Sequence, residues 1–338
     1  MQSPRKLLFL KVPYSKFTFL ILASCILNLD SNPIFVATKI KVVNTKFINW
    51  VILIALAITW GSSFILMKRG MDVYSSEEVA ALRIFIAFLF LSPLIFKHVN
   101  KSLLKHWKGF VGMGVLGNLI PAFLFTKAET GISSSLTGML NSLTPLFTLL
   151  LGVLLFKSKT KLINVIGILI GFVGAIGLLL VGKSEDMNNN LLFGFYVVLA
   201  TICYALSVNI IKKDLNEVNS ITATVWAMMF IGPFAGIYLF GFTDFTTKLS
   251  SNPLAYTSLW YIVILAVFGT ALSVMIFNVL IRNTNALFAS SVTYLIPIVA
   301  LMWGVLDGED VQLLHFVWII IILLGVYLVN KKAVQPNK

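Results

Sequence analysis

Long runs of apolar residues alternate with short charged connectors along most of the chain. A helix needs about 20 apolar residues to cross a hydrocarbon core about 30 Å thick. Ten runs approach or reach that length: residues 48–67, 79–96, 107–125, 133–156, 162–181, 191–211, 221–240, 259–281, 286–306 and 313–329. They are too long for barrel strands, and backbone polar groups in lipid must be bonded internally, so each run is predicted to be helical. The predicted fold class is an all-α polytopic membrane protein with ten transmembrane helices.

The composition agrees with this fold class and removes others. Hydrophobic residues make up 58% of the 338 residues and charged residues 12%, whereas a soluble domain is roughly 45–50% apolar and about 25% charged. The net charge is +13, but nucleic-acid binders gather basic residues on a soluble face, and here these residues interrupt apolar runs. We therefore exclude a soluble enzyme, a nucleic-acid-binding domain and a disordered tail. The expected partners are the lipid bilayer and a small-molecule substrate, with no nucleic acid.

Basic residues concentrate in alternate connectors, and this gives the orientation by the positive-inside rule. The connectors after the second, fourth, sixth and eighth runs, with both ends of the chain, hold most lysines and arginines. The opposite connectors hold most acidic residues: Asp72, Glu77, Glu78, Glu129, Glu185, Asp186, Asp244, Asp307, Glu309 and Asp310. Both termini are predicted to be cytoplasmic, in a multi-pass protein of the plasma (inner) membrane. This requires an even number of spans.

The first 46 residues form a separate N-terminal extension. Its apolar stretch, residues 17–29, is too short to span a bilayer comfortably. Three interpretations exist: an interfacial segment, a signal peptide cleaved near Cys25, and an upstream extension from a misassigned start codon. We favour the last.

The chain contains an internal repeat. Four residue pairs share an offset of 152 residues: Gly117/Gly269, Phe125/Phe277, Pro145/Pro297 and Gly152/Gly304. An offset of 144 places Trp60 on Tyr204 and Lys68-Arg69 on Lys212-Lys213. Two five-helix domains follow, 47–182 and 190–332. Because each contains an odd number of spans, the copies are inverted relative to each other, as in many secondary transporters that alternate access around a site between repeats.

Small residues and prolines inside the runs allow structural and functional interpretations. Four glycines lie along one face of the fifth run, at Gly167, Gly171, Gly174 and Gly177. Such a face suits close helix packing within the bundle or a dimer seam, so the expected state is a monomer or a homodimer.

The repeat-related Pro145 and Pro297 are predicted to bend their helices, either as hinges of a transport cycle or as static bends.

Arg83 is the one strongly charged residue well inside a run, and such a charge is costly unless it faces a cavity or a partner. It either binds a substrate carboxylate or phosphate, or extends to the nearby membrane surface. Mid-helix polar and aromatic side chains could hydrogen-bond a small solute and wall its pocket. The other candidates for substrate binding are Trp60, Asn141, Tyr204, Asn278 and Tyr294; the alternative for each is interhelical packing.

The runs show no catalytic or metal-binding pattern. No nucleophile–base pair or metal-ligand spacing is evident, so no catalytic residue, metal or cofactor is expected. Glu129, just past the third run, is the acid closest to a span and is interpreted as a solvated connector residue. Residues 177–184 fit the P-loop pattern but close an apolar helix instead of following a strand, so a nucleotide site is not expected.

The stretch Trp60-Gly61-Ser62-Ser63-Phe64, followed by Leu82-Arg83, resembles the EamA family of the drug/metabolite transporter superfamily. The resemblance covers about residues 46–332. It implies a basket of ten helices around a central cavity, in proteins that usually export small metabolites, amino acids or toxic compounds. Mapped onto this chain, the cavity residues are Trp60, Arg83, Asn141 and Tyr204. Tyr204-Ala205 stands where the family's second repeat often has Trp-Ala, which weakens any inference about substrate from that helix.

The leading hypothesis is a secondary transporter that exports small metabolites or amino acids by alternating access. The first alternative is an exchanger of phosphorylated metabolites or nucleotide sugars, which would need more cationic groups in the spans than Arg83. The second is a membrane-embedded lipid-modifying enzyme, and the missing catalytic pattern argues against it. The chain is therefore not expected to be an enzyme.

Overall fold

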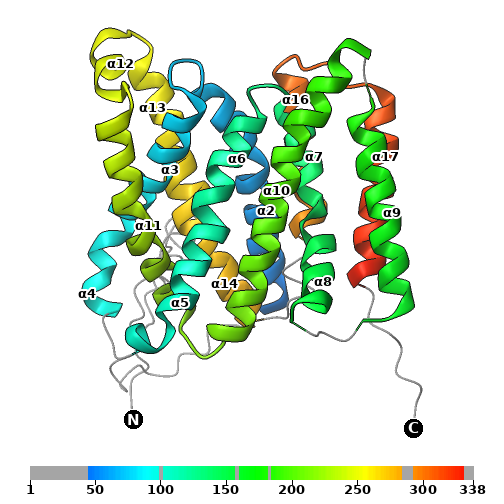
Figure 1. Ribbon diagram of the computed structural model, residues 1–338, viewed down its shortest axis with the longest axis horizontal. Coiled ribbons are helices and arrows are strands. Elements are labelled where there is room, and N and C mark those ends of the chain that lie inside the picture. Colours follow the sequence, from blue (N-terminus) through cyan, green and yellow to red (C-terminus); the bar gives the residue numbers. More distant parts are fainter. Residues whose placement is uncertain (1–44, 99–101, 157–159, 182–183, 284–291, 331–338) are drawn as a thin grey trace, which may run out of the picture. The chain divides into compact units, whose positions relative to one another are not determined.

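The computed structural model describes residues 45–98, 102–156, 160–181, 184–283 and 292–330, whose regular secondary structure is helical throughout (Figure 1). The N-terminal extension expected over residues 1–46 lies outside these ranges except for its last two residues. Contacts divide the chain into the units Met1–Thr45 and Lys46–Lys338, and the helices belong to the second unit.

The helices follow one another with short connectors. Their bounds are α2 (Thr45–Gly70), α3 (Ser76–Leu91), η1 (Ser92–Leu94), α4 (Ile95–His98), α5 (Ser102–Gly114), η2 (Val115–Leu119), α6 (Ile120–Ala128), α7 (Ser134–Leu140), η3 (Asn141–Leu143), α8 (Thr144–Leu154), α9 (Leu162–Leu179), α10 (Ser184–Asp214), α11 (Ser220–Phe242), α12 (Phe245–Ser251), α13 (Ala255–Ile264), η4 (Leu265–Leu272), α14 (Ser273–Asn283), α16 (Val292–Leu306) and α17 (Leu313–Asn330). Of the short elements, η1 and η3 are 3₁₀ helices, and η2 and η4 are π-helical.

Eight helical segments in the described ranges are long and apolar enough to cross a membrane. They are Phe47–Gly70, Ser76–His98, Lys105–Ala128, Ser134–Leu154, Leu162–Leu179, Leu191–Asp214, Ser220–Phe242 and Ala255–Leu280. Two further apolar helices, Val292–Leu306 and Leu313–Val329, are shorter. The first eight predicted runs therefore correspond to candidate spans, and the last two to shorter helices. The predicted start of the ninth run at residue 286 lies outside the described residues. The chain is a multi-pass integral membrane protein.

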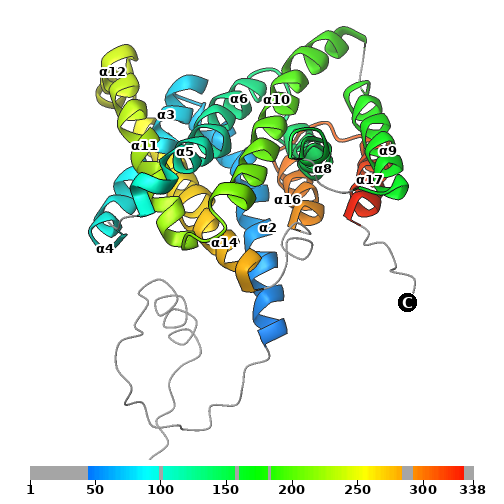
Figure 2. The ribbon, with the colours of Figure 1, turned by 60° about the horizontal axis from the view of Figure 1, so that its bottom comes forward.

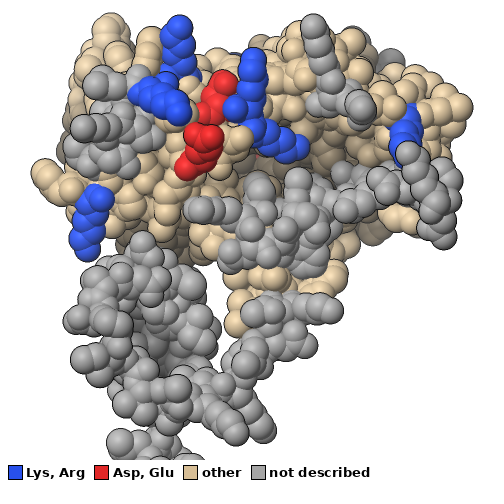
Figure 3. Space-filling view, turned by 90° about the horizontal axis from the view of Figure 1, so that it is seen from below, with Lys and Arg blue, Asp and Glu red and all other residues tan. Residues whose placement is uncertain are grey.

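The two ends of the helices differ in charge. The α2–α3, α6–α7 and α16–α17 connectors meet at the upper end in Figure 1, which we name the acidic end; it carries Asp72, Glu129, Asp307, Glu309 and Asp310. The lower end, which we name the basic end, carries Lys97, Lys105, Lys108, Lys212 and Lys213. Seen from below, more basic than acidic side chains are visible on the described part of this face (Figure 3).

Local side-chain contacts fix where two helices begin at the acidic end. The Ser75 hydroxyl accepts a hydrogen bond from the Glu78 backbone N–H at 3.2 Å, and the Glu78 carboxylate accepts one from the Ser75 N–H at 2.7 Å. This reciprocal capping box starts α3. The Ser133 hydroxyl accepts from the Leu136 N–H at 3.2 Å and starts α7.

The π-helical segments η2 and η4 occupy repeat-related positions. η2 contains Gly117, and η4 contains its counterpart Gly269 at the 152-residue offset. In each segment, the side chain after the glycine donates a hydrogen bond to the carbonyl oxygen five residues earlier. This distance is 3.2 Å for Asn118 and 3.3 Å for Thr270. π-Helical turns are frequent at functional sites, and among the described residues one such segment lies in each half of the chain.

The glycine face of α9 packs against α17, and the two helices lie side by side in both ribbon views (Figures 1 and 2). A Cβ added at Gly325 on α17 would lie 2.6 Å from the backbone N of Gly171 and 2.7 Å from the carbonyl O of Gly167. The backbones approach this closely because neither helix has a side chain at the contact. Packing within the bundle is therefore confirmed for this face, which leaves no room for a dimer seam there.

Replacing Gly325 by Ala is expected to lower the melting temperature of the purified protein. The added methyl group would meet backbone atoms of α9 that cannot turn aside, and overpacking typically costs about 1–3 kcal/mol. Gly241→Ala on α11 is the matched control, because nothing lies within 4 Å of a Cβ built there. Equal melting temperatures for the two variants in detergent would contradict the close packing of α9 on α17.

The two repeat-related prolines differ in their surroundings. The turn η3 separates α7 from α8, and Pro145 stands in the first turn of α8. Pro297 lies inside α16, which runs without a break from Val292 to Leu306. Both prolines are buried. Between these two positions, α-helical geometry is interrupted only next to Pro145.

Candidate substrate site

Arg83 on α3 lies inside the bundle with 9% of its surface exposed. Its Nε donates to Thr270 Oγ1 on η4 at 2.7 Å, and its Nη1 lies 3.8 Å from Met67 Sδ on α2. The guanidinium also interacts with the Tyr204 hydroxyl on α10. The interpretation in which Arg83 extends to the membrane surface is therefore wrong, because helices from both halves of the chain enclose this side chain.

Two aromatic contacts near Arg83 each join a residue of one half of the chain to a residue of the other half. Trp60 packs edge-on against Phe277 with ring centroids 5.0 Å apart, and Tyr204 packs against Phe125 at 5.7 Å. Tyr204 is the counterpart of Trp60 at the 144-residue offset, and Phe277 is the counterpart of Phe125 at the 152-residue offset. The same contact is thus made twice, each time between the two halves.

The glycines of the two π-helical segments show the same pattern of contacts between the halves. A Cβ at Gly117 would lie 2.5 Å from Ser207 Oγ, and a Cβ at Gly269 would lie 2.9 Å from Ser63 Oγ. Ser207 is the counterpart of Ser63 at the 144-residue offset. The Trp60 indole donates to the Gly269 carbonyl at 3.1 Å. The first helix of each half therefore touches the π-helical segment of the other half.

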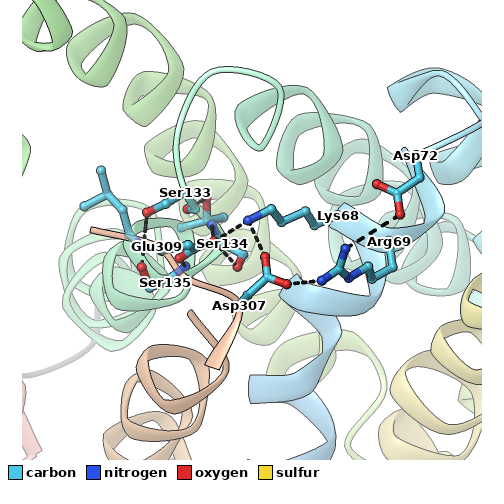
Figure 4. A network of polar contacts seen from close by, with 10 residues as sticks. Lys68, Arg69, Asp72, Ser133, Ser134, Ser135, Asp307 and Glu309 are labelled. Atoms are coloured by element: carbon cyan, nitrogen blue, oxygen red, sulfur yellow. Dashed lines mark hydrogen bonds and ion pairs between the residues drawn. The ribbon is translucent and has the colours of Figure 1, made fainter. Parts of the chain in front are cut away.

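Ion pairs join the two halves at the acidic end (Figure 4). Lys68 Nζ, in the last turn of α2, lies 2.6 Å from Asp307 and 3.0 Å from Glu309 in the α16–α17 connector, and Arg69 also pairs with Asp307. The Asp307 and Glu309 side chains are only 7% and 6% exposed. Salt screens such partly buried pairs less than surface pairs. We name these four residues the Lys68 network.

Glu309 also binds the first turn of α7. Its Oε1 accepts hydrogen bonds from the Ser134 N–H at 3.0 Å and the Ser134 hydroxyl at 2.7 Å, and its Oε2 accepts one from the Ser135 N–H at 3.0 Å. Burial alone would raise the pKa of Glu309, but the hydrogen bonds from Ser135 and Ser134 and the Lys68 ammonium outweigh it and hold that pKa at about 2. Glu309 is therefore ionised at any physiological pH.

Glu129 corrects the expectation of a solvated connector residue. It follows α6 directly, and both of its carboxyl oxygens are buried with no hydrogen-bond partner among the described residues. Burial raises the pKa of Glu129 well above its ordinary value, and the negative charge of Glu309 raises it further, against the opposing effects of Lys68 and Arg83. The neutral acid is thus the favoured form here.

Two stretches of the chain match the same family. The EamA-like transporter family matches residues 48–180 and again residues 192–331. This chain belongs to the EamA-like transporter family. The family resemblance noted in the sequence is therefore confirmed, and the protein is a membrane transporter.

Relatives of this EamA transporter carry similar descriptions. It is 26% identical over 287 residues to an uncharacterized transporter of Archaeoglobus fulgidus, covering 84% of this chain and 99% of that relative. It is 24% identical over 284 residues to the uncharacterized inner membrane transporter YedA of Escherichia coli strain K12, covering 82% and 89% of the two chains. One solved structure matches 83% of this chain and 96% of its own with a TM-score of 0.57 at 13% identity. That likeness shows a shared fold.

Three of the six predicted substrate-binding residues come together in this EamA transporter. Arg83 interacts with Tyr204, and its acceptor Thr270 directly follows Gly269, which binds Trp60. These residues come from α2, α3, η4 and α10, so both halves contribute to the cluster.

The other three predicted residues make different contacts. Asn278 donates to Thr224 Oγ1 on α11 at 3.2 Å. Asn141 begins η3, and its carbonyl oxygen accepts from the Thr144 hydroxyl at 2.8 Å. Tyr294 is partly buried against the same hydrophobic core as Trp60 and Tyr204. None of these contacts joins Asn141 or Asn278 to Arg83.

Sequence reasoning missed Thr270 and the partners of Lys68. The position of Thr270, directly after a repeat-related glycine, was the available signal. Asp307 and Glu309 were visible as charges of the acidic connectors, but nothing in the sequence paired them with Lys68. In the described parts of the chain, no group of three or more His, Cys, Asp or Glu side chains is placed to hold a metal ion.

Proposed function

We propose that this EamA transporter is a secondary transporter in which two inverted five-helix repeats, 47–182 and 190–332, alternate access to a shared site. In this arrangement α16 and α17 supply the ninth and tenth spans. Support comes from the exchanged contacts Trp60–Phe277 and Tyr204–Phe125. Such exchange is expected when two copies of one unit pack about a pseudo-two-fold axis in the membrane plane.

The proposed orientation places both termini in the cytoplasm and the acidic end outside, in the inner membrane. The lysines at the basic end favour this orientation, because positively charged connectors are retained on the cytoplasmic side. The description of the Escherichia coli relative as an inner membrane transporter supports the proposed location.

The observation that carries the functional proposal is the enclosed Arg83 between the two halves. Its guanidinium would bind the carboxylate of an exported amino acid or small metabolite, and Trp60 and Tyr204 would wall the pocket. Thr270 holds the Arg83 Nε, and the outer nitrogens of the guanidinium, which contact Met67 and Tyr204 in this structure, would exchange those contacts for a ligand. Asn141, Asn278 and Tyr294 remain candidates for contacts with the substrate in other states of the transport cycle. Pro145 and Pro297 remain candidate hinges.

The Lys68 network would close the acidic end in one half of the cycle. At the 152-residue offset, Asp307 and Glu309 correspond to Leu155 and Lys157, so the acidic partners have no sequence counterpart at the basic end. There, Lys213 Nζ instead lies over the Phe156 ring, 5.8 Å from its centroid. The ion pairs of the Lys68 network therefore stabilise closure of the acidic end and have no equivalent in sequence at the basic end.

The alternative substrate class is a phosphorylated metabolite or nucleotide sugar. Among the described Lys and Arg residues, Arg83 alone is buried, whereas a phosphate group carries up to two negative charges near neutral pH. The single charge of one guanidinium is balanced better by one carboxylate than by a phosphate group. A lipid-modifying enzyme has less support, because the site offers Arg83, Trp60, Tyr204 and Thr270 but no paired nucleophile and base.

Counterflow in proteoliposomes tests the proposal. Vesicles are loaded with an unlabelled amino-acid mixture or with a mixture of sugar phosphates, and entry of each labelled compound is followed. We expect accelerated exchange of at least one amino acid over protein-free vesicles. Acceleration of sugar phosphates alone would favour the alternative, and no acceleration of any compound would contradict the transport proposal.

A further inference from the structure

Glu129 occupies a position that the transport mechanism above does not use. It lies directly after α6, preceded by the fully buried Ala128. The following connector is covered by α10, where a Cβ added at Gly131 would lie only 2.0 Å from the Phe193 ring. Both Glu129 oxygens are enclosed there without a hydrogen-bond partner. An ionised carboxylate in such surroundings is strongly disfavoured, because it has lost water and gained no donor.

The nearby cations are already engaged with other groups. Lys68 on α2 is held by Asp307 and Glu309, and Arg83 on α3 is bonded to Thr270. The same elements also carry Glu77 on α3, which pairs with Lys127 of α6 at 3.4 Å, Glu78 on α3, which pairs with Lys248 at 2.6 Å, and Tyr204 on α10, which interacts with Arg83. Glu309 contributes a negative charge in the α16–α17 connector. None of these groups donates a hydrogen bond to Glu129.

We propose that Glu129 binds a proton each time the acidic end closes and releases it when that end opens. The inference rests on the alternating access proposed above. In the open state, water reaches the carboxyl group and stabilises its ionised form. Closing excludes that water, so one proton from the outer solution adds to one carboxylate oxygen, and opening returns it.

The sign of the pH dependence follows from the two states. A hydrated Glu129 ionises near its ordinary pKa of about 4.3, whereas burial raises the pKa of the enclosed carboxyl well above that value. Between the two pKa values, the closed state holds one more proton than the open state. The ratio of closed to open molecules should therefore fall about tenfold for each unit of pH increase. Glu309, with its pKa at about 2, stays ionised in this window.

A substrate-free distance measurement tests the inference. Spin labels are attached at Asp72→Cys and Asp310→Cys, two exposed connector positions of the acidic end, after both native cysteines are replaced by serine. Distances are measured in liposomes by double electron–electron resonance between about pH 5 and about pH 9, a range that begins above the ordinary pKa of a hydrated glutamate. The longer-distance population should grow as the pH rises. Glu129→Gln should hold the shorter distance at every pH, and Glu77→Gln, the matched control, should behave as the parent.

Each outcome decides between alternatives. One distance distribution at all pH values in the parent, or the parent's pH dependence in Glu129→Gln, would overturn the proton site. If Glu129→Gln does not fold, Glu129→Asp must keep a pH-dependent distribution with a shifted midpoint, and an unchanged midpoint would overturn the proposal. Counterflow without pH-dependent distances would leave transport standing and remove the proton site. pH-dependent distances without flux of any tested compound would support the proton site and contradict the transport proposal.

Discussion

Replacing Arg83 by Ala is expected to abolish amino-acid counterflow while leaving the transporter folded in the membrane. The guanidinium is the proposed anchor of the substrate carboxylate, and it is enclosed where water cannot substitute for it. Truncating one partner of a buried charge pair costs about 2–5 kcal/mol, which is about a 30-fold or greater loss of apparent affinity. Arg83→Lys should retain part of the activity, because it keeps the charge but cannot bond Thr270 and a carboxylate together.

The controls for Arg83 separate binding from structure. Thr270→Val removes the acceptor of the Arg83 Nε and should weaken transport, whereas Thr270→Ser keeps a hydroxyl there and should preserve most of it. Lys127→Ala removes an exposed cation at the acidic end and should leave counterflow unchanged. Melting temperature and gel-filtration profile are measured for each variant. Normal counterflow by well-folded Arg83→Ala would show that Arg83 only holds the helices together.

The pattern of apolar runs predicted the helices well because lipid restricts the possible structures so strongly. Ten runs lead to eight helical segments of spanning length and two shorter apolar helices, Val292–Leu306 and Leu313–Val329. The offsets of 152 and 144 residues identified pairs that occupy matching contacts, such as Trp60 with Tyr204. The π-helical segments were not predicted, because a widened turn depends on the neighbouring helix and leaves no periodic signal in one sequence.

The candidate site was predicted only where a residue was unusual in its own run. A charge inside an apolar run identified Arg83, but its partner Thr270 lies 187 residues away in sequence, and no local pattern links the two. Glu129 was assigned to solvent because it follows a predicted span; the enclosure of its carboxyl oxygens depends on tertiary packing. Asn141 and Asn278 are polar residues inside apolar runs, as Tyr204 is, yet the hydrogen bonds described for them lie away from Arg83.

Replacing Glu309 by Gln is expected to open the acidic end. The Glu309 carboxylate accepts three hydrogen bonds from Ser134 and Ser135 and pairs with Lys68. A glutamine amide has the same size, but it carries no charge and turns a donor group toward donors. Hydrogen bonds to charged groups contribute about 1.5–3 kcal/mol each, so losing even one should shift the closed–open equilibrium about tenfold or more.

The opening can be measured by the reactivity of a single cysteine. Thr137→Cys, in a background without native cysteines, places a thiol at a fully buried position one turn into α7. A membrane-impermeant maleimide added outside should label it about tenfold faster or more in Glu309→Gln, matching the shift expected from one lost charged hydrogen bond. Asp310→Asn, at the exposed neighbouring position, should not change the rate, and Glu309→Asp should fall between.

Labelling also distinguishes the two forces that can hold this end closed. α16 packs directly on α7, where a Cβ at Gly138 would lie 2.3 Å from the Ala300 methyl group. If that apolar contact alone holds the end closed, Glu309→Gln will label at the parent rate, and high salt will have no effect. If the Lys68 network holds it, the variant will label faster and added salt will speed the parent toward it, because ionic interactions weaken with ionic strength.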